Sequence, residues 1–361
     1  YYMHCTEGKD RCGIASAVLE CFMGASYGEV VADYLVTYYN YYGIQPGTEK
    51  AANIAKYGIV SALQTMFGVE DLSKADLQAE ALDYLLEIGL NAEEIGSLLL
   101  TLSGLPSSLE GLVVILHSND VHGNIMGYSQ MAALRDAFES LGAEVILADA
   151  GDYSQGTPYV STTKGADAIE MMNVAGYDVA TLGNHEFDYG MDQFKKLNRL
   201  ADFPYVSANF MDKNGETVLD AYSMQNVHGV KIAFVGVTTP KTITSSTPAY
   251  FQNEKGEWIF SFCQDETGEL VYTAVQSAVD AARKEGADYV IALAHLGIEK
   301  DCEPWTSSDV INNTTGIDVM LDGHSHSVIE KELVKNKDGK DVILSSTGTK
   351  LENIGCLTIS A

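Results

Sequence analysis

The sequence predicts an α/β protein preceded by a helical segment, and three observations lead to this fold class. Residues 13–104 carry apolar side chains at three- and four-residue spacing, which is the period of a helix. From residue 112 onward, short apolar runs alternate with helical patterns, as expected where helices cover a sheet. Between these regions, residues 103–111 are rich in Gly, Pro and Ser, which favour turns.

These differences in pattern predict two domains. Residues 1–105 would form the first domain, residues 106–111 a linker, and residues 112–361 the second domain. The chain begins with Tyr1 rather than Met, and we expect it to be a piece of a longer protein.

The composition excludes two functional classes. The 361 residues include 22 Lys and Arg against 50 Asp and Glu, which gives a net charge of −28. Such a surface repels nucleic acid, so no nucleic-acid partner is expected. No apolar run approaches the ~18 residues of a membrane span, so none is expected. A phosphate site must therefore supply its own positive charge, from local cations or metals.

Five helices are expected in the first domain. Asp76 and Asn91 are residue types that commonly begin helices. A glycine follows four of the five patterns, where helices commonly end. These glycines are Gly24, Gly43, Gly68 and Gly89. The expected helices are residues 15–23, 30–42, 54–67, 77–88 and 95–102.

Seven strands are expected in the second domain, and several of them end in polar clusters. In open α/β sheets, loops at the carboxyl ends of strands are where sites assemble. The expected strands are residues 113–117, 145–148, 179–182, 205–208, 232–237, 289–293 and 319–321. The polar clusters are residues 118–123, 149–152, 183–188, 294–295 and 322–326.

The first 13 residues are typical of a strand, a tight loop and a helix that begins near Cys12. Cys5 and Arg11 bracket the loop. Backbone N–H groups at such a loop bind anions and lower the pKa of a thiol, so Cys5 could act as a nucleophile. Arg11 could hold a phosphoryl group through two hydrogen bonds. This chemistry would form and then hydrolyse a phosphocysteine.

The spacing His-Cys-x-x-Gly-x-x-Arg in residues 4–11 resembles the signature of cysteine-dependent tyrosine phosphatases, closest to a bacterial branch. Members of that branch act on phosphotyrosine and, in some cases, phosphoinositides, so a phosphotyrosine protein or a phosphoinositide is an expected partner. The resemblance implies these roles: Cys5 as nucleophile, Gly8, Lys9 and Arg11 in phosphate binding, and Asp10 as general acid.

One residue departs from the family pattern. Cys12 stands where the family usually has Thr or Ser, which assists departure of the thiolate. The alternative interpretation is that Cys5 and Arg11 reach this spacing by chance in a strand-to-helix turn.

The polar clusters of the second domain contain residues that suit a metal centre. A mixed Asp, His and Asn set favours divalent zinc, manganese, cobalt or iron. Asp152 is the expected shared carboxylate, which would hold two ions ~3.5–4 Å apart. The candidate residues are Asp120, His122, Asp152, Asn184, His185, His295, His324 and His326.

The order of these motifs resembles the calcineurin-like metallophosphoesterases. The segments at residues 119–123 and 183–190 narrow the resemblance to the 5′-nucleotidase and UDP-sugar hydrolase branch. This resemblance covers residues 112–361 and implies an α/β/β/α sandwich. Members of the branch continue into a substrate domain after the metal domain, which we expect to be missing here.

The same resemblance implies a role for each candidate. His185 would stabilise charge on the phosphoryl group, oriented by Asp188, and Asn184 would also contact phosphate. Glu186 and Phe187 would pack or support the site. One ion would be bound by Asp120, His122, Asp152 and His326, the last standing where some members have Gln, and the other by Asp152, Asn184, His295 and His324.

The expected function is metal-dependent hydrolysis of phosphate monoesters on a nucleotide or sugar nucleotide, joined to a second, Cys5-dependent phosphatase activity. A 2′,3′-cyclic nucleotide phosphodiesterase is one alternative, because the same metal core serves both reactions. A non-catalytic metal- or phosphate-binding module is another, although metal binding alone needs neither His185 nor Asp188. The nucleotidase branch is usually exported, so we expect export or the cell surface, whereas a reactive Cys5 would suit the cytoplasm.

Overall fold

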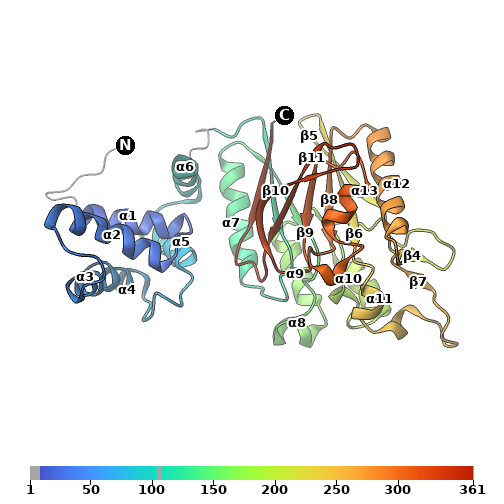
Figure 1. The fold of residues 1–361 in the computed structure, drawn as a ribbon, viewed down its shortest axis with the longest axis horizontal. Coiled ribbons are helices and arrows are strands. Elements are labelled where there is room, and N and C mark those ends of the chain that lie inside the picture. Colours follow the sequence, from blue (N-terminus) through green and yellow to red (C-terminus); the bar gives the residue numbers. More distant parts are fainter. Residues whose placement is uncertain (1–8, 104–107, 361) are drawn as a thin grey trace. The chain divides into compact units, whose positions relative to one another are not determined.

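The computed structural model describes residues 9–103 and 108–360. The chain divides into two compact units, residues 1–107 and residues 108–361 (Figure 1). We refer to them as the helical unit and the α/β unit.

The helical unit follows the expected helices closely. Asp76 accepts a hydrogen bond from the N–H of Ala79 (3.1 Å), and Asn91 accepts one from the N–H of Glu94 (3.0 Å), so both residues begin helices as predicted. The helices are α1 Arg11–Phe22, α2 Tyr27–Tyr42, α3 Glu49–Ala55, a π-helical segment Lys56–Val60, α4 Ser61–Phe67, α5 Leu77–Glu87 and α6 Ala92–Ser103.

The core of the helical unit is apolar. Val18 and Phe22 of α1 pack with Ile59 of the π-helical segment and with Leu77 and Leu85 of α5. The π-helical segment continues α3 into α4, so one expected helix, residues 54–67, is part of a longer run that begins at Glu49. Thr48 begins this run by accepting a hydrogen bond from the N–H of Ala51 (3.3 Å).

The α/β unit contains two larger sheets. The four-stranded sheet has the order β12-β1-β2-β3, and the six-stranded sheet has the order β10-β11-β9-β8-β6-β5. The strands are β1 Leu112–Ser118, β2 Glu144–Asp149, β3 Val179–Ala180, β5 Tyr222–Val227, β6 Val230–Thr238, β8 Tyr289–His295, β9 Val319–Asp322, β10 Val328–Lys335, β11 Asp341–Thr347 and β12 Gly355–Ser360; β4 Met211–Asp212 and β7 Phe260–Ser261 form a separate pair.

The two larger sheets pack face to face. Val113 and Ile146 of the four-stranded sheet share a buried cluster with Ile232, Phe234 and Ile291 of the six-stranded sheet. Along β6 the side chains alternate, because Ala233 and Val235 belong instead to the cluster beneath the helices. The sheets therefore form the two inner layers of the unit.

Helices cover the outer faces of the two sheets (Figure 1). Helices α7 Gly127–Ser140 and α9 Ala166–Ala175 lie on the side of the four-stranded sheet. Helices α12 Glu269–Glu285 and α13 Ser307–Asn313 pack on the six-stranded sheet through Val275, Val279 and Ile311. This is the expected α/β/β/α sandwich. Three further helices lie in the connections: α8 Pro158–Thr163, α10 Met191–Leu200 and α11 Thr242–Ser245.

The prediction of a strand at residues 205–208 is wrong, because this segment forms no regular strand. The N–H of Val206 donates to the carbonyl of Ala180 in β3, whereas the N–H of Ala208 donates to the carbonyl of Gly236 in β6. The segment thus crosses from one sheet to the other and makes only isolated bridges. A side chain at Gly236 would overlap the carbonyl of Val206, so glycine permits this crossing.

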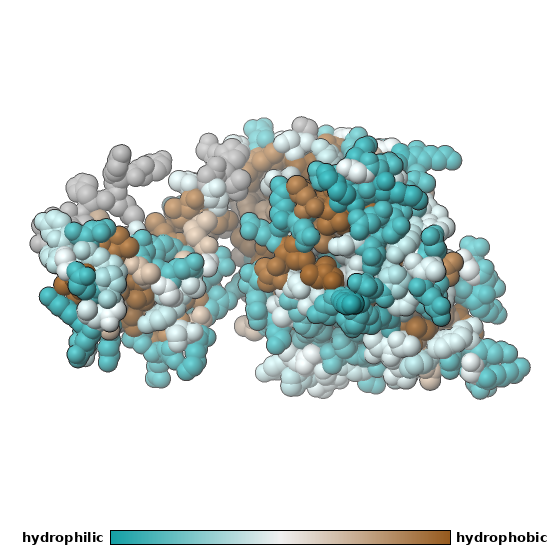
Figure 2. Space-filling model, in the orientation of Figure 1, coloured by the Kyte–Doolittle hydropathy of each residue, from teal (hydrophilic) through white to brown (hydrophobic). Residues whose placement is uncertain are grey.

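Strands β4, β5, β7, β10, β11 and β12 were not expected. Three of them, β5, β10 and β12, are sheet edges, where one side faces no partner strand and the apolar pattern is weak. Glu330, Lys331 and Glu332 are exposed on β10 and protect that edge. Figure 2 shows hydrophilic side chains over most of the visible face of this unit. Among the described helices, none has the length and apolarity needed to span a membrane.

Candidate metal centre

Five loops bring the candidate ligands together at one end of the sandwich. Asp120 follows β1, Asp152 follows β2 and Asn184 follows β3 in the four-stranded sheet. His295 ends β8, and His324 follows β9 in the six-stranded sheet. The carboxyl ends of parallel strands from both sheets therefore meet, which is where sites form in α/β proteins.

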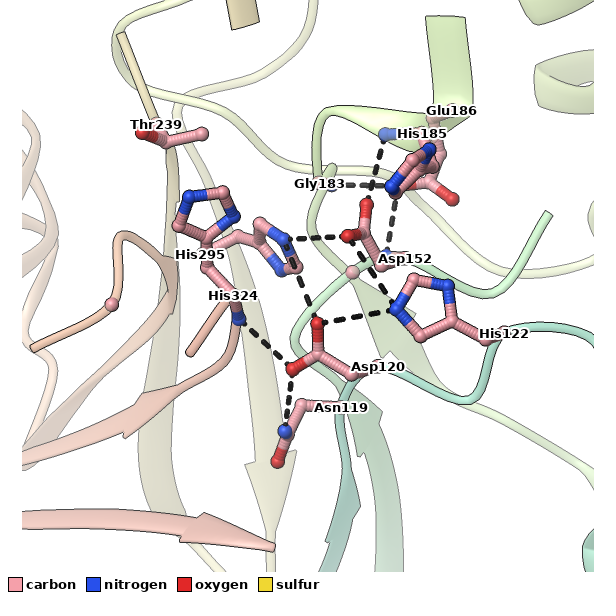
Figure 3. A network of polar contacts seen from close by, with 12 residues as sticks. Asn119, Asp120, His122, Asp152, Gly183, His185, Glu186, Thr239, His295 and His324 are labelled. Carbon is pink, nitrogen blue, oxygen red and sulfur yellow. Dashed lines mark hydrogen bonds and ion pairs between the residues drawn. The ribbon is translucent and has the colours of Figure 1, made fainter. Parts of the chain in front are cut away.

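Two carboxylates occupy the middle of this cluster (Figure 3). The Oδ1 of Asp120 lies 3.4 Å from the Nε2 of His326 and 3.8 Å from the Nε2 of His122. The Oδ2 of Asp152 lies 3.0 Å from the Nε2 of His295 and 4.0 Å from the Nε2 of His122. Asp120 and Asp152 are thus each flanked by imidazole nitrogens.

The described residues form three overlapping groups that could hold a metal ion. Within each group, the ligand atoms lie within 4.8 Å of one another. The groups are Asp120, His122 and His326; Asp152, His295 and His324; and His122, Asp152 and His185. The first group contains three of the four ligands expected for one ion, and the second contains three of the four expected for the other. The third group brings His185 close to His122 and Asp152.

Buried atoms without partners show that the residues fit divalent cations. The Oδ1 of Asp120, the Oδ1 of Asn184 and the Nε2 of His295 are buried and make no hydrogen bond. A carbonyl only accepts, so the Nδ1–H of His295 donates to Ala150 (2.7 Å), and the Nε2, which lies 3.0 Å from the Oδ2 of Asp152, is the nitrogen that faces the cluster. An unsatisfied buried polar atom costs ~1–3 kcal/mol. A cation bound by these atoms would remove that cost.

The backbone of the ligands is also unusual. Ten non-glycine residues of the described chain have positive φ, and five of them are candidate ligands. These are Asp120 (φ 50°), His122 (46°), Asp152 (63°), His324 (77°) and His326 (52°). Left-handed backbone in such residues costs on the order of 1–3 kcal/mol each and concentrates at functional sites.

Two glycines allow the ligand loops to approach. A side chain at Gly183 would overlap the carboxylate of Asp152, and one at Gly151 would overlap the backbone of Gly183. Gly151 also has a φ of 93°. The Gly-Asp and Gly-Asn-His motifs therefore need glycine for close contact between the loops after β2 and β3.

The charges of the cluster are strongly coupled. Burial lowers the pKa of His295, but the charges of Asp152 and Asp120 raise it to about 10. Burial and the charge of His295 lower the pKa of His324 to about 4. Burial raises the pKa of Asp152, but His295 lowers it well below its usual range. Metal binding here would displace the proton of His295.

His185 and Asp188 form a pair beside the ligands. The Nδ1 of His185 lies 2.6 Å from the Oδ2 of Asp188, and the backbone N–H of His185 donates to the Oδ1 of Asp152 (2.9 Å). Burial lowers the pKa of His185, but the hydrogen bond to Asp188 and the charge of Asp152 raise it to about 9. Both side chains remain partly exposed, at 31% and 24%. The pair can therefore reach a bound anion.

The structure describes only some residues of the expected phosphate loop. Cys5 and Gly8 lie outside the described residues. Arg11 is exposed in the first turn of α1, and Asp10 precedes that helix without a side-chain capping hydrogen bond. The Nζ of Lys9 lies 5.0 Å from the centre of the Tyr42 ring. The helix begins where the sequence predicted, near Cys12.

Three buried carboxylates lie behind the ligands; Asp149 and Asp322 had no role in the sequence prediction, and Glu186 was expected to pack or support the site. Asp149 accepts from the hydroxyl of Ser118 (2.6 Å) and the N–H of Gly151 (2.8 Å). Asp322 accepts from the N–H groups of Leu296 (3.0 Å) and Gly297 (3.3 Å). Glu186 accepts four backbone N–H groups. The sequence signal that could have indicated such carboxylates is an acidic residue at or just after the end of an apolar strand.

Two family models match the chain. Residues 134–349 match a family described as bacterial capsule synthesis protein PGA_cap, and residues 1–89 match one described as tyrosine phosphatase family. The second match covers less than half of the chain.

Curated relatives are nucleotide-hydrolysing enzymes by name. The trifunctional nucleotide phosphoesterase protein YfkN of Bacillus subtilis (strain 168) is 30% identical over 252 residues, which cover 59% of this chain and 16% of the relative. A 5′-nucleotidase of Vibrio vulnificus (strain CMCP6) is 31% identical over 235 residues, covering 60% and 40%. The chain therefore spans less than half the length of either relative.

A solved structure shares the fold. The 5′-nucleotidase precursor from Thermus thermophilus aligns with a TM-score of 0.57 and 25% identity, over 69% of this chain and 51% of that chain. The predicted α/β metallophosphoesterase fold is thereby confirmed. Because the first family model matches more than half of the 361 residues, the chain belongs to the family described as bacterial capsule synthesis protein PGA_cap, and the relatives and solved structure that it resembles are named as nucleotide phosphoesterases and 5′-nucleotidases.

Proposed function

We propose that the α/β unit hydrolyses phosphate monoesters at a two-metal centre. The observation that carries this proposal is the convergence of Asp120, Asn184 and His295 at the ends of strands, where their buried ligand atoms make no hydrogen bond. The His185–Asp188 pair beside them supplies what a binding module would not need.

The ligand residues divide between two ions of zinc, manganese, cobalt or iron. Such ions, when bound, polarise a phosphoryl oxygen and lower the pKa of a water molecule. His185, held by Asp188, stabilises the negative charge that develops on the phosphoryl group. The proposed sets are Asp120, His122, Asp152 and His326 for one ion and Asp152, Asn184, His295 and His324 for the other.

The proposed substrates are nucleotides or sugar nucleotides, in line with the names of the relatives. We assign residues 112–361 to the catalytic domain, residues 106–111 to a linker and residues 1–105 to a phosphatase-like domain. A 2′,3′-cyclic nucleotide is the alternative substrate, because the same two-metal core would serve both reactions. Export of the protein is also proposed, because relatives include a nucleotidase named as a precursor and nucleotidases of snake venom.

A second candidate activity belongs to the helical unit. The match of residues 1–89 to a tyrosine phosphatase family favours a Cys5-dependent reaction on a phosphotyrosine protein or a phosphoinositide. Arg11 would bind the phosphoryl group, with Lys9, Gly8 and Asp10 as expected from the motif.

Chelation tests the main proposal. The full chain is assayed with an aryl phosphate after treatment with a chelator, and again after readdition of manganese, cobalt or zinc. Activity should disappear and return. Activity that resists the chelator but is lost on thiol alkylation would instead be attributed to Cys5. Activity that survives both treatments would contradict both site assignments.

A further inference from the structure

Glu186 contacts both the loop after β2 and the loop after β3, but it is neither a proposed ligand nor part of the His185–Asp188 pair. It belongs to the short 3-10 helix His185–Phe187 and is only 1% exposed. Figure 3 shows it beside Gly183 and Asp152. A buried carboxylate needs several hydrogen bonds to offset the loss of water.

Both oxygens of Glu186 accept backbone N–H groups. The Oε2 accepts from Asp152 (2.9 Å) and from Gly183 (2.6 Å). The Oε1 accepts from Tyr153 (3.1 Å) and from Ser154 (3.2 Å). One side chain therefore joins the loop after β2 to the loop after β3.

The two joined loops carry different ligands. Asp152 is on the first loop, and Asn184 follows Gly183 directly on the second. Two further bonds cross the same gap, from the N–H of His185 to Asp152 (2.9 Å) and from the hydroxyl of Ser154 to the carbonyl of His185 (3.1 Å). Glu186 supplies the larger share of the contacts between these loops.

None of the other expected ligands donates a hydrogen bond to Glu186. Asp120 and His122 follow β1, and their N–H groups donate to the carbonyls of Gly151 and Asp152, but both residues also belong to a loop with partners of its own, and His326 lies in the loop after β9. The N–H of Lys350 and the hydroxyl of Thr349 both donate to the carbonyl of Asp120. A change at Glu186 should therefore affect one ion more than the other.

We propose that Glu186 is a positioning residue that sets the separation of Asp152 from Asn184 and thereby the affinity of the second ion, on the ligand sets of the proposed function. Glu186→Gln keeps the size of the side chain but replaces one accepting oxygen by an NH₂ group, which would face backbone N–H donors. The carboxylate is the group that satisfies all four donors.

Asp178 offers a matched control. Its Oδ2 accepts the N–H of Leu147 in β2 (2.8 Å), and it precedes β3, away from the loop after that strand. Asp178→Asn thus weakens a hydrogen bond between a carboxylate and the backbone of β2, and leaves the loops that carry the ligands unchanged.

The test is a calorimetric titration of the chelator-treated full chain with Mn²⁺, accompanied by paramagnetic resonance spectra. The wild-type chain and Asp178→Asn should bind two ions that are magnetically coupled. Glu186→Gln should bind one ion within about threefold of wild type and the other about 10–100-fold more weakly, with the coupled signal lost at low Mn²⁺. Melting temperatures measured without metal should be similar for the two variants.

Three outcomes decide the matter. Two coupled ions of wild-type affinity in Glu186→Gln would overturn the inference, and so would equal weakening of both ions. A wild-type chain that binds no ion would overturn the proposed function instead. If Glu186→Gln does not fold, Glu186→Asp keeps both oxygens on a shorter side chain, and it should weaken the same ion selectively or the inference is wrong.

Discussion

The two units of the chain differ in how their backbone and polar groups are used. Among residues 9–103, every residue with positive φ is a glycine, whereas ten non-glycine residues of the α/β unit have positive φ. No polar side chain of residues 9–103 is fully buried, but the α/β unit buries Asp149, Glu186 and Asp322 among others. Within the described residues, strain and buried charge are therefore confined to the unit that holds the candidate centre.

This difference shows where each unit obtains its structure. The helical unit is stabilised by local capping and an apolar core, as at Asp76 and Phe22. The ligand loops of the α/β unit are held by contacts between residues far apart in sequence, such as Asn119 with the N–H of Thr347 (2.8 Å).

The largest expected effect comes from removing the shared carboxylate. Asp152→Ala should lose both ions and more than ~10⁴-fold in kcat/KM, beyond the range of one proton-transfer group. Metal analysis and steady-state kinetics check this. The exposed Asp338→Ala should behave as wild type. Full metal content in Asp152→Ala would show that Asp152 is not a shared ligand and that its strained backbone does not serve metal binding.

The next effect separates chemistry from metal binding. His185→Ala should keep both ions and lose about 10²–10⁴-fold in kcat, because its imidazole stabilises the transition state rather than a metal. Metal analysis of the purified variant is the decisive measurement. A loss of one ion would mean that His185 is a ligand, as its proximity to His122 and Asp152 allows.

A smaller effect concerns substrate choice. By their proposed roles, the ligands and the His185–Asp188 pair act on the phosphoryl group, which all phosphate monoesters share. The chain should hydrolyse AMP, UDP-glucose and an aryl phosphate within about tenfold of one another in kcat/KM, which corresponds to ~1.4 kcal/mol. Steady-state kinetics with the three substrates check this. A strong preference for one nucleotide would reveal a base pocket.

The smallest effect lies in the helical unit. Burial and the nearby charge of Asp33 raise the pKa of Glu20 to about 7. Because the folded-state pKa is raised, stability is greatest at low pH and falls as the pH rises from about 4.5 through 7. Protection of α1 amides from hydrogen exchange should fall about two- to fivefold between pH 6 and pH 8, a small change because Glu20 is partly exposed.

Matched variants isolate this effect. Glu20→Gln should remove the pH dependence of protection, corrected for intrinsic exchange, while Glu87→Gln at an exposed position of α5 should leave it unchanged. An unchanged slope in Glu20→Gln would show that another group is responsible.

Much of the fold was accessible from the sequence because local signals were strong. Central strands such as β1 and β8 are apolar on both faces, and caps such as Asn91 act within a few residues. Edge strands such as β10 were missed because their exposed residues carry charge. The crossing at residues 205–208 depends on contacts with distant Gly236, which no local pattern encodes.

The sequence predicted the residues of the candidate site, but not how all of them act together. The ligand residues were predicted from short motifs, and the structure brings Asp120, Asp152 and His295 together. Their assignment to individual ions stays a prediction. The role of Glu186 could not be derived from sequence, because it depends on four backbone N–H groups in two loops that lie far apart in the chain.

Anomalous diffraction from crystals of the full chain grown with Mn²⁺ tests the central claim most directly. We expect two peaks ~3.5–4 Å apart, one beside Asp120 and His326, the other beside Asn184 and His295, with Asp152 between them. A single peak, or peaks away from these residues, would contradict the two-metal centre.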